Sequence, residues 1–544
     1  MTLNVNLFDW CIFVLYLAAV FGFGIFMARR EKTSADFFLA GRRLPWYAIA
    51  LSLFSTNIST GSLIGLAGEG YRYGMAVGTL EWGAILCLLL LAFVFLPYYQ
   101  RQRVYTMPEF MEHRYNLPVR IIFSGSVLIF EMCVNKPFML YAGALAIEVM
   151  FGIPLIWGMV GIGLFTVAYT AYGGLGAVVW ADVVQAVLMI IGATMLVCLG
   201  LHQIGGVHAL MSQAGDKMHV CLPANHPAYP FPATMIGGYF LISVYYWCQN
   251  QTLVQRALGA RSEWDARMGA IGACYIKLFL PFIYVLPGVI AFVLLPNLQE
   301  PDKALPMLIN KVVPHGLSGL MLTAVVAALM ASLSSNLNSW ATQFTCDFYH
   351  RLIDKRASEK RLILVGRVAS VFVLATSILI APNLQGSTSI LQFLLTGLAY
   401  IATPVVVLFT IGIFWAGATS AAAICILIIS PMLCYAAQHM RQMFGFGPLP
   451  QSIVYWMPIA VGGAVLAMVV VSLLTKAKSP ALLEGLIWNR KDTLTFGKHL
   501  MRRLDEDANG QPVRSAAQAP LWKDHRLIAL VAVLLMSALI WLFR

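Results

Sequence analysis

Two runs of hydroxyl-bearing residues interrupt apolar stretches that are otherwise long enough to cross a membrane. The first, SLFSTNISTGS, begins at Ser52, and the second, ALMASLSSNLNS, runs from Ala328 to Ser339. Side chains of Ser, Thr and Asn compete for backbone hydrogen bonds and Gly61 weakens a helix further, so the first run predicts a helix break. A break releases carbonyl oxygens that suit a hard monovalent cation. Close packing of helices through small residues is the alternative for either run.

Five ionisable residues lie inside apolar stretches, where burial of a charge is costly. Glu131 and Lys136 are close enough in sequence to form a structural ion pair, and Asp182 lies near the end of its stretch, where it could be interfacial. Glu81 and Lys277 lie well inside theirs. A carboxylate and an ammonium that face one cavity can accept hydrogen bonds from, and donate them to, a polyhydroxylated solute. A purely stabilising Glu81–Lys277 pair is the alternative.

Aromatic residues add a third kind of candidate. The segment SVYYWCQNQ contains Tyr245, Tyr246 and Trp247. Rings of this kind stack on the apolar faces of sugars or close a cavity. At the end of a span they could instead be interfacial anchors.

The elements that carry these residues are membrane helices. The chain is 60% hydrophobic and only 11% charged, whereas soluble domains are about 25% charged. Apolar runs of about 20 residues recur, without the alternation of a transmembrane barrel. The net charge of +12 comes from basic residues in short loops, which is typical of membrane topology and does not indicate a nucleic-acid partner. The ten cysteines are scattered singly, as small core residues are.

The apolar runs predict about fourteen membrane helices. They lie near 8–28, 46–70, 76–99, 119–150, 154–172, 177–202, 233–258, 269–298, 316–344, 361–383, 388–415, 417–437, 453–474 and 525–543. With the N-terminus outside, cytoplasmic loops contain 28 Lys and Arg residues and the outer side contains six. This asymmetry predicts an N-out, C-out orientation.

Several motifs, in this order along the chain, resemble those of the sodium/solute symporters. They are SLFSTNIS, GLAGEGY, LEWGA, YTMPEF, YGGLGAVVWADVVQ, YYWCQNQTLVQR and NSWATQFTCDFY. The nearest branch is that of the sodium–glucose and bacterial sodium–galactose cotransporters, and the resemblance covers about 8–415. It implies an all-α integral membrane protein with a LeuT-type fold of two inverted five-helix repeats.

That resemblance also implies the organisation of the chain. Residues 1–544 form a single transmembrane transporter domain. Its parts are a peripheral first helix at 8–28, a first repeat at 46–202, a second repeat at 233–415, and peripheral helices at 417–543 with a cytoplasmic loop at 475–525.

In the family, sodium lies where the broken second span meets the ninth. By position, the resemblance implies the carbonyls of Ser55, Ile58 and Ala328 as ligands, together with hydroxyls at positions 331 and 332. Ser332 matches, but Ala331 stands where a serine is usual, so one hydroxyl ligand is missing. Weaker sodium binding, a water substitute and proton coupling are therefore open alternatives. Asp182 matches an acidic residue linked to cation coupling.

The resemblance implies a solute site as well. Residues that match the family's solute contacts are Asn57, Glu81, Tyr246, Trp247 and Lys277, with Tyr246 at the position of an inner gate. At four positions this chain has another side chain than the family pattern does. These are Ser62, Leu80, Ser243 and Thr396. Because the larger rim side chains are replaced, we expect a roomier pocket around a preserved Glu–Asn–Lys set.

We therefore expect a secondary active symporter that uses sodium to import a sugar or sugar-like solute by alternating access. We expect it in a plasma (bacterial inner) membrane, surrounded by lipid, with no obligate protein partner and no enzymatic activity. One alternative is a sodium- or proton-coupled symporter of sialic acid, a polyol or a carboxylate. More remote alternatives are a non-transporting solute sensor and a polytopic membrane enzyme, which would need a metal or nucleophile motif that the spans lack.

Overall fold

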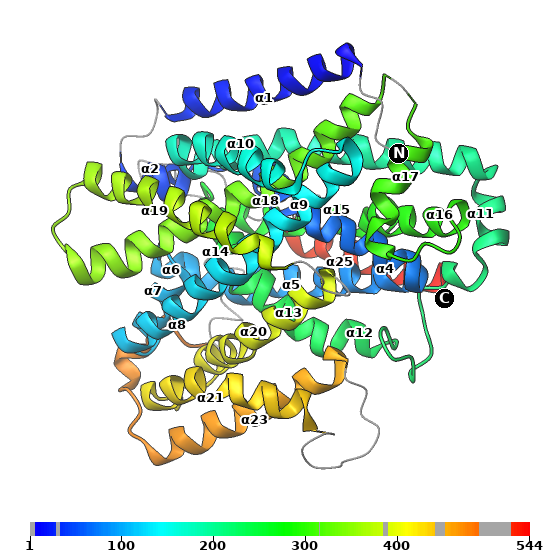
Figure 1. Ribbon diagram of the computed structural model, residues 1–544. Helices are drawn as coiled ribbons and strands as arrows, with labels where there is room; N and C mark the ends of the chain where they lie inside the picture. Colours follow the sequence, from blue (N-terminus) through cyan, green and yellow to red (C-terminus); the bar gives the residue numbers. More distant parts are fainter. Residues whose placement is uncertain (1–5, 29–32, 315, 385–389, 441–451, 489–523) are drawn as a thin grey trace.

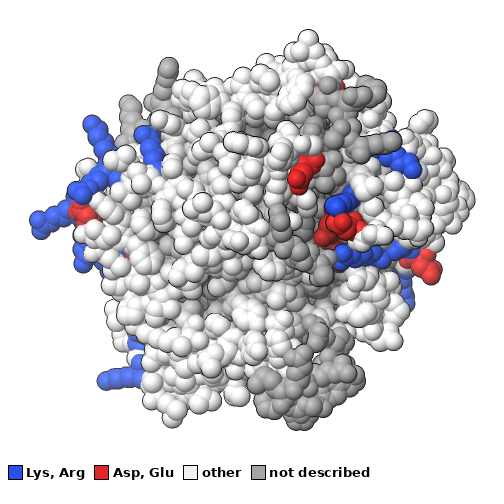
Figure 2. Space-filling view, viewed as in Figure 1, with Lys and Arg blue, Asp and Glu red and all other residues white. Residues whose placement is uncertain are grey.

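The structure is a computed structural model that describes residues 6–28, 33–314, 316–384, 390–440, 452–488 and 524–544. The regular secondary structure of these residues is helical, apart from one isolated β-bridge between Leu44 and Ala260. Figure 2 shows charged side chains gathered at two opposite ends of the visible face, with a broad uncharged band between them. Such a band is what a lipid-facing surface requires.

The helices follow one another closely along the chain. The first half contains α1 (Leu7–Ala28), α2 (Ser34–Leu39), α3 (Trp46–Asn57), α4 (Thr60–Tyr73), α5 (Gly78–Leu90), α6 (Leu96–Gln102), α7 (Met107–Arg114), α8 (Leu117–Phe130), α9 (Lys136–Phe151), α10 (Leu155–Ile204), α11 (Val207–Ala214), α12 (Ala233–Ile236) and α13 (Gly238–Cys248). The second half contains α14 (Gln251–Leu258), α15 (Glu263–Leu280), α16 (Leu286–Leu294), α17 (Ala304–Val312), α18 (Ser318–Gln343), α19 (Glu359–Ile380), α20 (Ile390–Phe414), α21 (Ser420–Gln438), α23 (Ile453–Leu474) and α25 (His525–Leu542).

Eleven helical segments among the described residues are long and apolar enough to cross a membrane, whereas the sequence predicts about fourteen spans. Gly61–Gln102 and Leu155–Ile204 each join two predicted spans, and the predicted span at 233–258 is divided into α12, α13 and α14. A helix of 50 residues would be about 75 Å long, far more than one crossing needs. Gly174, with φ 49° and ψ −161°, kinks α10 between its two predicted spans. The number of crossings stays a prediction.

The helix break predicted at the first hydroxyl run is confirmed. Helix α3 ends at Asn57 and α4 begins at Thr60, with the Ser59 side chain accepting a hydrogen bond from the Ser62 N–H. A second break separates α13 from α14, where the Asn250 side chain accepts from the Thr252 N–H. In each case a short polar side chain caps the new helix, as N-cap residues do.

Three π-helical segments are each followed directly by a dipeptide whose second residue is proline. They are η3 (Leu91–Phe95), η4 (Glu131–Asn135) and η6 (Pro281–Val285), which precede Leu96–Pro97, Lys136–Pro137 and Leu286–Pro287. A proline has no N–H to donate to the carbonyl four residues back. The N–H of Lys136 donates instead to the Glu131 carbonyl five residues back. The proline after each of these π-helical segments is therefore its local cause in the sequence.

Helix α18 lies in the middle of the molecule (Figure 1), and all its residues from Met321 to Gln343 are buried. It packs against α1, α3, α10 and α19. Backbones approach very closely elsewhere too, since a Cβ at Gly288 of α16 would lie 1.9 Å from the Ala67 carbonyl oxygen of α4. Small residues thus allow the tight helix packing expected in membranes.

Both ends of the described chain lie beside loops that the charge pattern predicts to be extracellular. The Asp9 carboxylate of α1 accepts a hydrogen bond from the Gly319 N–H at the start of α18 (2.7 Å). After α25, the Phe543 carbonyl accepts from the Val220 N–H (2.9 Å). These contacts agree with the predicted N-out, C-out orientation, which stays a prediction.

Candidate functional site

A cavity of about 110 Å³ lies where the α3–α4 break meets α5, α13, α15 and α20. Eight of the nine positions that the sequence analysis compares with the family's solute contacts line it. They are Asn57, Ser62, Leu80, Glu81, Ser243, Tyr246, Trp247 and Lys277. Thr396 of α20 is not among the lining residues, although Leu394, Leu395 and Leu398 of the same helix are.

Glu81, Lys277 and Asn57 form one hydrogen-bonded cluster at this cavity. The Lys277 ammonium donates to the Glu81 carboxylate and to the Asn57 side-chain oxygen. It also lies 4.8 Å from the centre of the Trp247 ring, within range of a cation–π contact. The side chain of Glu81 is 12% exposed and that of Lys277 is 3% exposed. The cluster thus ties together three helices and carries no net charge.

Tyr246 lies between this cavity and a smaller one of about 30 Å³. Both cavities are lined by Ser62, Tyr246, Leu394 and Leu398. The smaller one is otherwise lined largely by neutral polar residues, namely Thr56, Ser59, Asn135, Asn250, Thr252 and Asn336. A chamber of this size has room for water. Tyr246 therefore borders both the larger cavity and a polar chamber next to the second helix break.

The predicted sodium ligands come from two segments that lie side by side. A direct link between α3 and α18 is the contact of the Thr56 and Ser335 hydroxyls, 3.0 Å apart. The Ser59 N–H donates to the Asn57 carbonyl (3.1 Å). In a continuous helix this N–H would donate to the Ser55 carbonyl, four residues back. The break thus releases the Ser55 carbonyl from its usual helical partner.

On the α18 side, the Ser332 hydroxyl donates to the carbonyls of Ala328 and Leu329 at 3.0 and 3.1 Å. Ala331 is fully buried and brings no oxygen from its side chain. The donor set consists of neutral carbonyls and a hydroxyl, which fits a hard monovalent cation. The assignment of these residues to sodium stays a prediction.

Asp182 is fully buried, so the interfacial alternative for it is wrong. One carboxylate oxygen, Oδ2, accepts hydrogen bonds from the hydroxyls of Ser52 (2.6 Å), Thr56 (3.3 Å) and Ser335 (3.3 Å). The guanidinium of Arg256 lies 3.5 Å from the same oxygen. Oδ1 has no hydrogen-bond partner among the described residues. Asp182 is therefore an anchor shared by α3, α10, α14 and α18.

Arg256 is a residue that the sequence analysis missed. It lies near the end of the predicted span at 233–258 and was not selected as a candidate, but the structure buries it completely in the last turn of α14. Its Nε donates to the Ser52 hydroxyl (2.9 Å), and its other nitrogens donate to the Ser335 hydroxyl and the Thr252 carbonyl. The available signal was that Arg256 is the last residue of the motif YYWCQNQTLVQR, one of those that resemble the family.

Glu131 and Lys136 form a buried ion pair at 3.0 Å, which confirms the structural alternative for these two residues. The Asn135 amide donates to the same Glu131 oxygen at 2.9 Å. The π-helical turn η4 brings the three side chains together. One oxygen of Glu131, Oε1, has no hydrogen-bond partner among the described residues.

A second network, also missed, lies on the side of the predicted extracellular loops. Glu69 of α4 is 1% exposed and accepts a hydrogen bond from the Tyr229 hydroxyl at 2.7 Å. The Gln392 amide of α20 donates to the hydroxyls of Tyr229 and Tyr239, each at 3.2 Å. Tyr239 lines the larger cavity. The network therefore joins α4, α13, α20 and the loop before α12 next to the cavity.

Comparisons with known proteins agree with this architecture. A model of the sodium:solute symporter family matches residues 37–430. The chain is 35% identical over 452 residues to a sodium/glucose cotransporter of Vibrio parahaemolyticus, covering 77% of this chain and 83% of that protein. It is 28% identical to sodium/glucose cotransporter 1 of Oryctolagus cuniculus, covering 94% and 85%. It is 33% identical to human sodium/myo-inositol cotransporter 2, covering 75% and 66%.

Solved structures share the fold at low sequence identity. A substrate-bound, outward-open Na⁺-coupled sialic acid symporter superposes with a TM-score of 0.78 at 24% identity, covering 87% of this chain and 99% of that one. A nucleobase-cation-symport-1 family transporter in a closed conformation superposes with a TM-score of 0.55 at 15% identity, covering 82% and 97%. Both similarities concern the arrangement of the helices.

Proposed function

The chain belongs to the sodium:solute symporter family, and from this premise we propose that it imports a sugar or sugar-like polyhydroxylated solute. It is a sodium-coupled solute symporter with a LeuT-type helical fold, and not an enzyme. We place it in the plasma membrane, or the inner membrane of a bacterium. We also assign the two inverted repeats to residues 46–202 and 233–415.

The single observation that supports a sugar best is the Glu81–Lys277–Asn57 cluster on the wall of the larger cavity. It offers both hydrogen-bond acceptors and donors, as the hydroxyls of a sugar require. Relatives named for glucose and for myo-inositol both carry ring-shaped, polyhydroxylated solutes.

Charge distinguishes this proposal from the alternative of an anionic solute such as a sialic acid or another carboxylate. Lys277 is the cationic residue in the lining of the cavity, and Glu81 already neutralises it. A carboxylate solute would have to compete with Glu81 for the same ammonium. The lining therefore favours a neutral solute.

Sodium acts in this proposal where α3 meets α18. The ligands are the carbonyls of Ser55, Ile58 and Ala328 and the hydroxyl of Ser332, with Asp182 as the coupling residue beside them. Bound sodium holds the end of α3 against α18 and so favours the state that accepts solute from outside. The solute then shifts the population toward occluded and inward-open states, and coupling requires that both ligands prefer the same conformation.

Uptake into proteoliposomes tests the coupling directly. We expect accumulation of labelled sugar when an inward sodium gradient is imposed, and only slow equilibration with equal sodium on both sides. A potassium gradient and a proton gradient serve as controls. Equal uptake under the sodium and potassium gradients would contradict sodium coupling, and a response to the proton gradient alone would establish the proton-coupled alternative.

Restoring a hydroxyl at position 331 provides a prediction for the ion site. The Ala331→Ser variant should lower the sodium concentration for half-maximal uptake by about tenfold, because it adds a buried oxygen ligand to a charged group. Sodium titrations of uptake measure this value. Ala331→Gly, which changes volume but adds no oxygen, is the control and should not tighten sodium binding. An unchanged sodium dependence in a folded Ala331→Ser protein would place the ion away from residue 331.

A further inference from the structure

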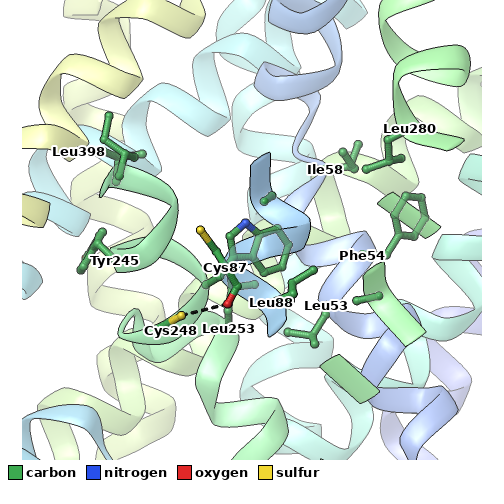
Figure 3. Close-up of a cluster of buried hydrophobic side chains, with 14 of the residues drawn as sticks. Leu53, Phe54, Ile58, Cys87, Leu88, Tyr245, Cys248, Leu253, Leu280 and Leu398 are labelled. Carbon is green, nitrogen blue, oxygen red and sulfur yellow. Dashed lines mark hydrogen bonds between the residues drawn. The ribbon is translucent and has the colours of Figure 1, made fainter. Parts of the chain in front are cut away.

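The cavity that contains Glu81 and Lys277 also has an aliphatic part. Leu66, Leu80, Ile242, Leu394, Leu395 and Leu398 all contribute to its lining. Three of these leucines come from α20, whereas the polar cluster comes from α3, α5 and α15. Figure 3 shows Leu398 on the opposite side of the buried cluster from Ile58, which lies at the helix break. The lining of the cavity therefore combines a polar cluster from α3, α5 and α15 with a leucine face from α20.

Spacing explains how α20 presents this surface. Leu395 and Leu398 follow Leu394 by one and four positions, so the three side chains lie on one face of the helix. Thr396, the polar residue in the same turn, does not line the cavity. We call the surface formed by Leu394, Leu395 and Leu398 the leucine wall.

The leucine wall has consequences for a sugar. A hydroxyl that leaves water and meets aliphatic carbon loses its hydrogen bonds, which weakens binding by about tenfold or more. A methyl group in the same place gains from leaving water, by roughly threefold to fourfold. A sugar whose entire rim is hydroxylated therefore loses hydrogen bonds wherever a hydroxyl faces the leucine wall.

We propose that the transported solute is a sugar that carries an apolar group, and that the leucine wall selects for this group. Candidate groups are the methyl of a 6-deoxyhexose and the methyl of a methyl glycoside. The polar edge of the ring faces Glu81, Lys277 and Asn57, and the apolar group faces α20. This inference rests on the proposed sugar transport and narrows its substrate class.

Competition with matched sugars tests the proposal on the full-length protein in proteoliposomes under a sodium gradient. The pairs are D-galactose and D-fucose, D-glucose and D-quinovose, and D-mannose and D-rhamnose, which differ only at carbon 6. Methyl glycosides of the three parent hexoses form a second arm. The labelled tracer is whichever of these sugars shows the highest sodium-dependent uptake.

In at least one pair, we expect the deoxy sugar or the methyl glycoside to inhibit tracer uptake at about a tenfold lower concentration than the parent hexose. A preference for the deoxy sugar places carbon 6 at the leucine wall, and a preference for the glycoside places carbon 1 there. Parent hexoses that compete better than both analogues in every pair would overturn the inference while leaving sodium-coupled sugar transport in place. No sodium-dependent uptake of any of these sugars would overturn the proposed function as well.

A variant of the wall connects the preference to α20. Leu395→Gln introduces an amide that can pair with a hydroxyl, so it should reduce the preference for the apolar analogue by about tenfold. Leu395→Met keeps the surface apolar and should keep the wild-type order of the sugars. The leucine wall would not select the solute if the ratio of inhibitory concentrations of the parent hexose and its apolar analogue were the same in Leu395→Gln and the wild type. Thermal unfolding of both variants confirms that each is folded.

Discussion

Replacing Glu81 with glutamine should lower sodium-dependent sugar uptake by at least about 100-fold. A site built to hydrogen-bond a substrate loses most of its activity when a buried polar partner is removed. In this protein Glu81 both lines the cavity and pairs with Lys277, so its loss affects solute binding and leaves the ammonium without its carboxylate. Initial rates of uptake into proteoliposomes measure the effect.

The double variant Glu81→Gln/Lys277→Met separates binding from folding. Each single variant leaves one buried charge unpaired, at a cost of roughly 3–5 kcal/mol in stability. The double variant leaves none, so it should unfold at a higher temperature than the Lys277→Met variant while remaining inactive. The matched control is Glu300→Gln/Lys303→Met, which removes an exposed ion pair at 2.8 Å. It should change neither the unfolding temperature nor the uptake much. Retained uptake in folded Glu81→Gln would remove Glu81 from the solute site.

The second large effect concerns Arg256. Replacing it with methionine should destabilise the protein by roughly 3–5 kcal/mol, because Asp182 then stays fully buried without a cation. Uptake should fall at least tenfold, since the contacts of Arg256 with Ser52 and Ser335 hold α14 against α3 and α18. Thermal unfolding in detergent and uptake at saturating sodium measure the two effects.

Two further variants test this interpretation. The double variant Asp182→Asn/Arg256→Met should recover most of the lost stability without recovering coupled uptake. Arg261→Met is the matched control, because Arg261 lies in the next loop, is 57% exposed and pairs with Asp265 at 2.8 Å. Its stability should stay within about 1 kcal/mol of the wild type. If Arg256→Met were as stable as Arg261→Met, the Asp182–Arg256 contact would not stabilise the packing of α14 against α3, α10 and α18.

Much of the fold could be predicted from the sequence because lipid imposes simple rules on it. Long apolar runs must be helical, and the polar run beginning at Ser52 could not continue as a regular helix. Glu81 and Lys277 could be selected as a pair because a charge inside an apolar run needs a partner. The family motifs then indicated which neighbouring residues belong to the same site.

Other features depend on contacts that a single sequence does not show. Arg256 and Glu69 lie near the ends of apolar runs, where a charge can face water or turn inward, and both turn inward. Thr396 has the right position in the chain, but the cavity is lined by its neighbours on α20. The span count differs because two helical segments, Gly61–Gln102 and Leu155–Ile204, each cover two predicted spans, and the predicted span at 233–258 is divided among three short helices. These outcomes are set by how helices pack and not by local composition.

The pairing of buried charges has an electrical consequence for the transport cycle. Glu81 with Lys277, Glu131 with Lys136, and Asp182 with Arg256 each bring one negative and one positive charge to nearly the same depth. When helices carrying such pairs move, little net charge crosses the membrane field, and a neutral solute adds none. The electrical work of the cycle, about 2.3 kcal/mol per unit charge for each 100 mV, then comes from the movement of the sodium charge through the membrane field. Membrane voltage should accordingly alter the apparent affinity for sodium, while solute binding at saturating sodium should not depend on voltage.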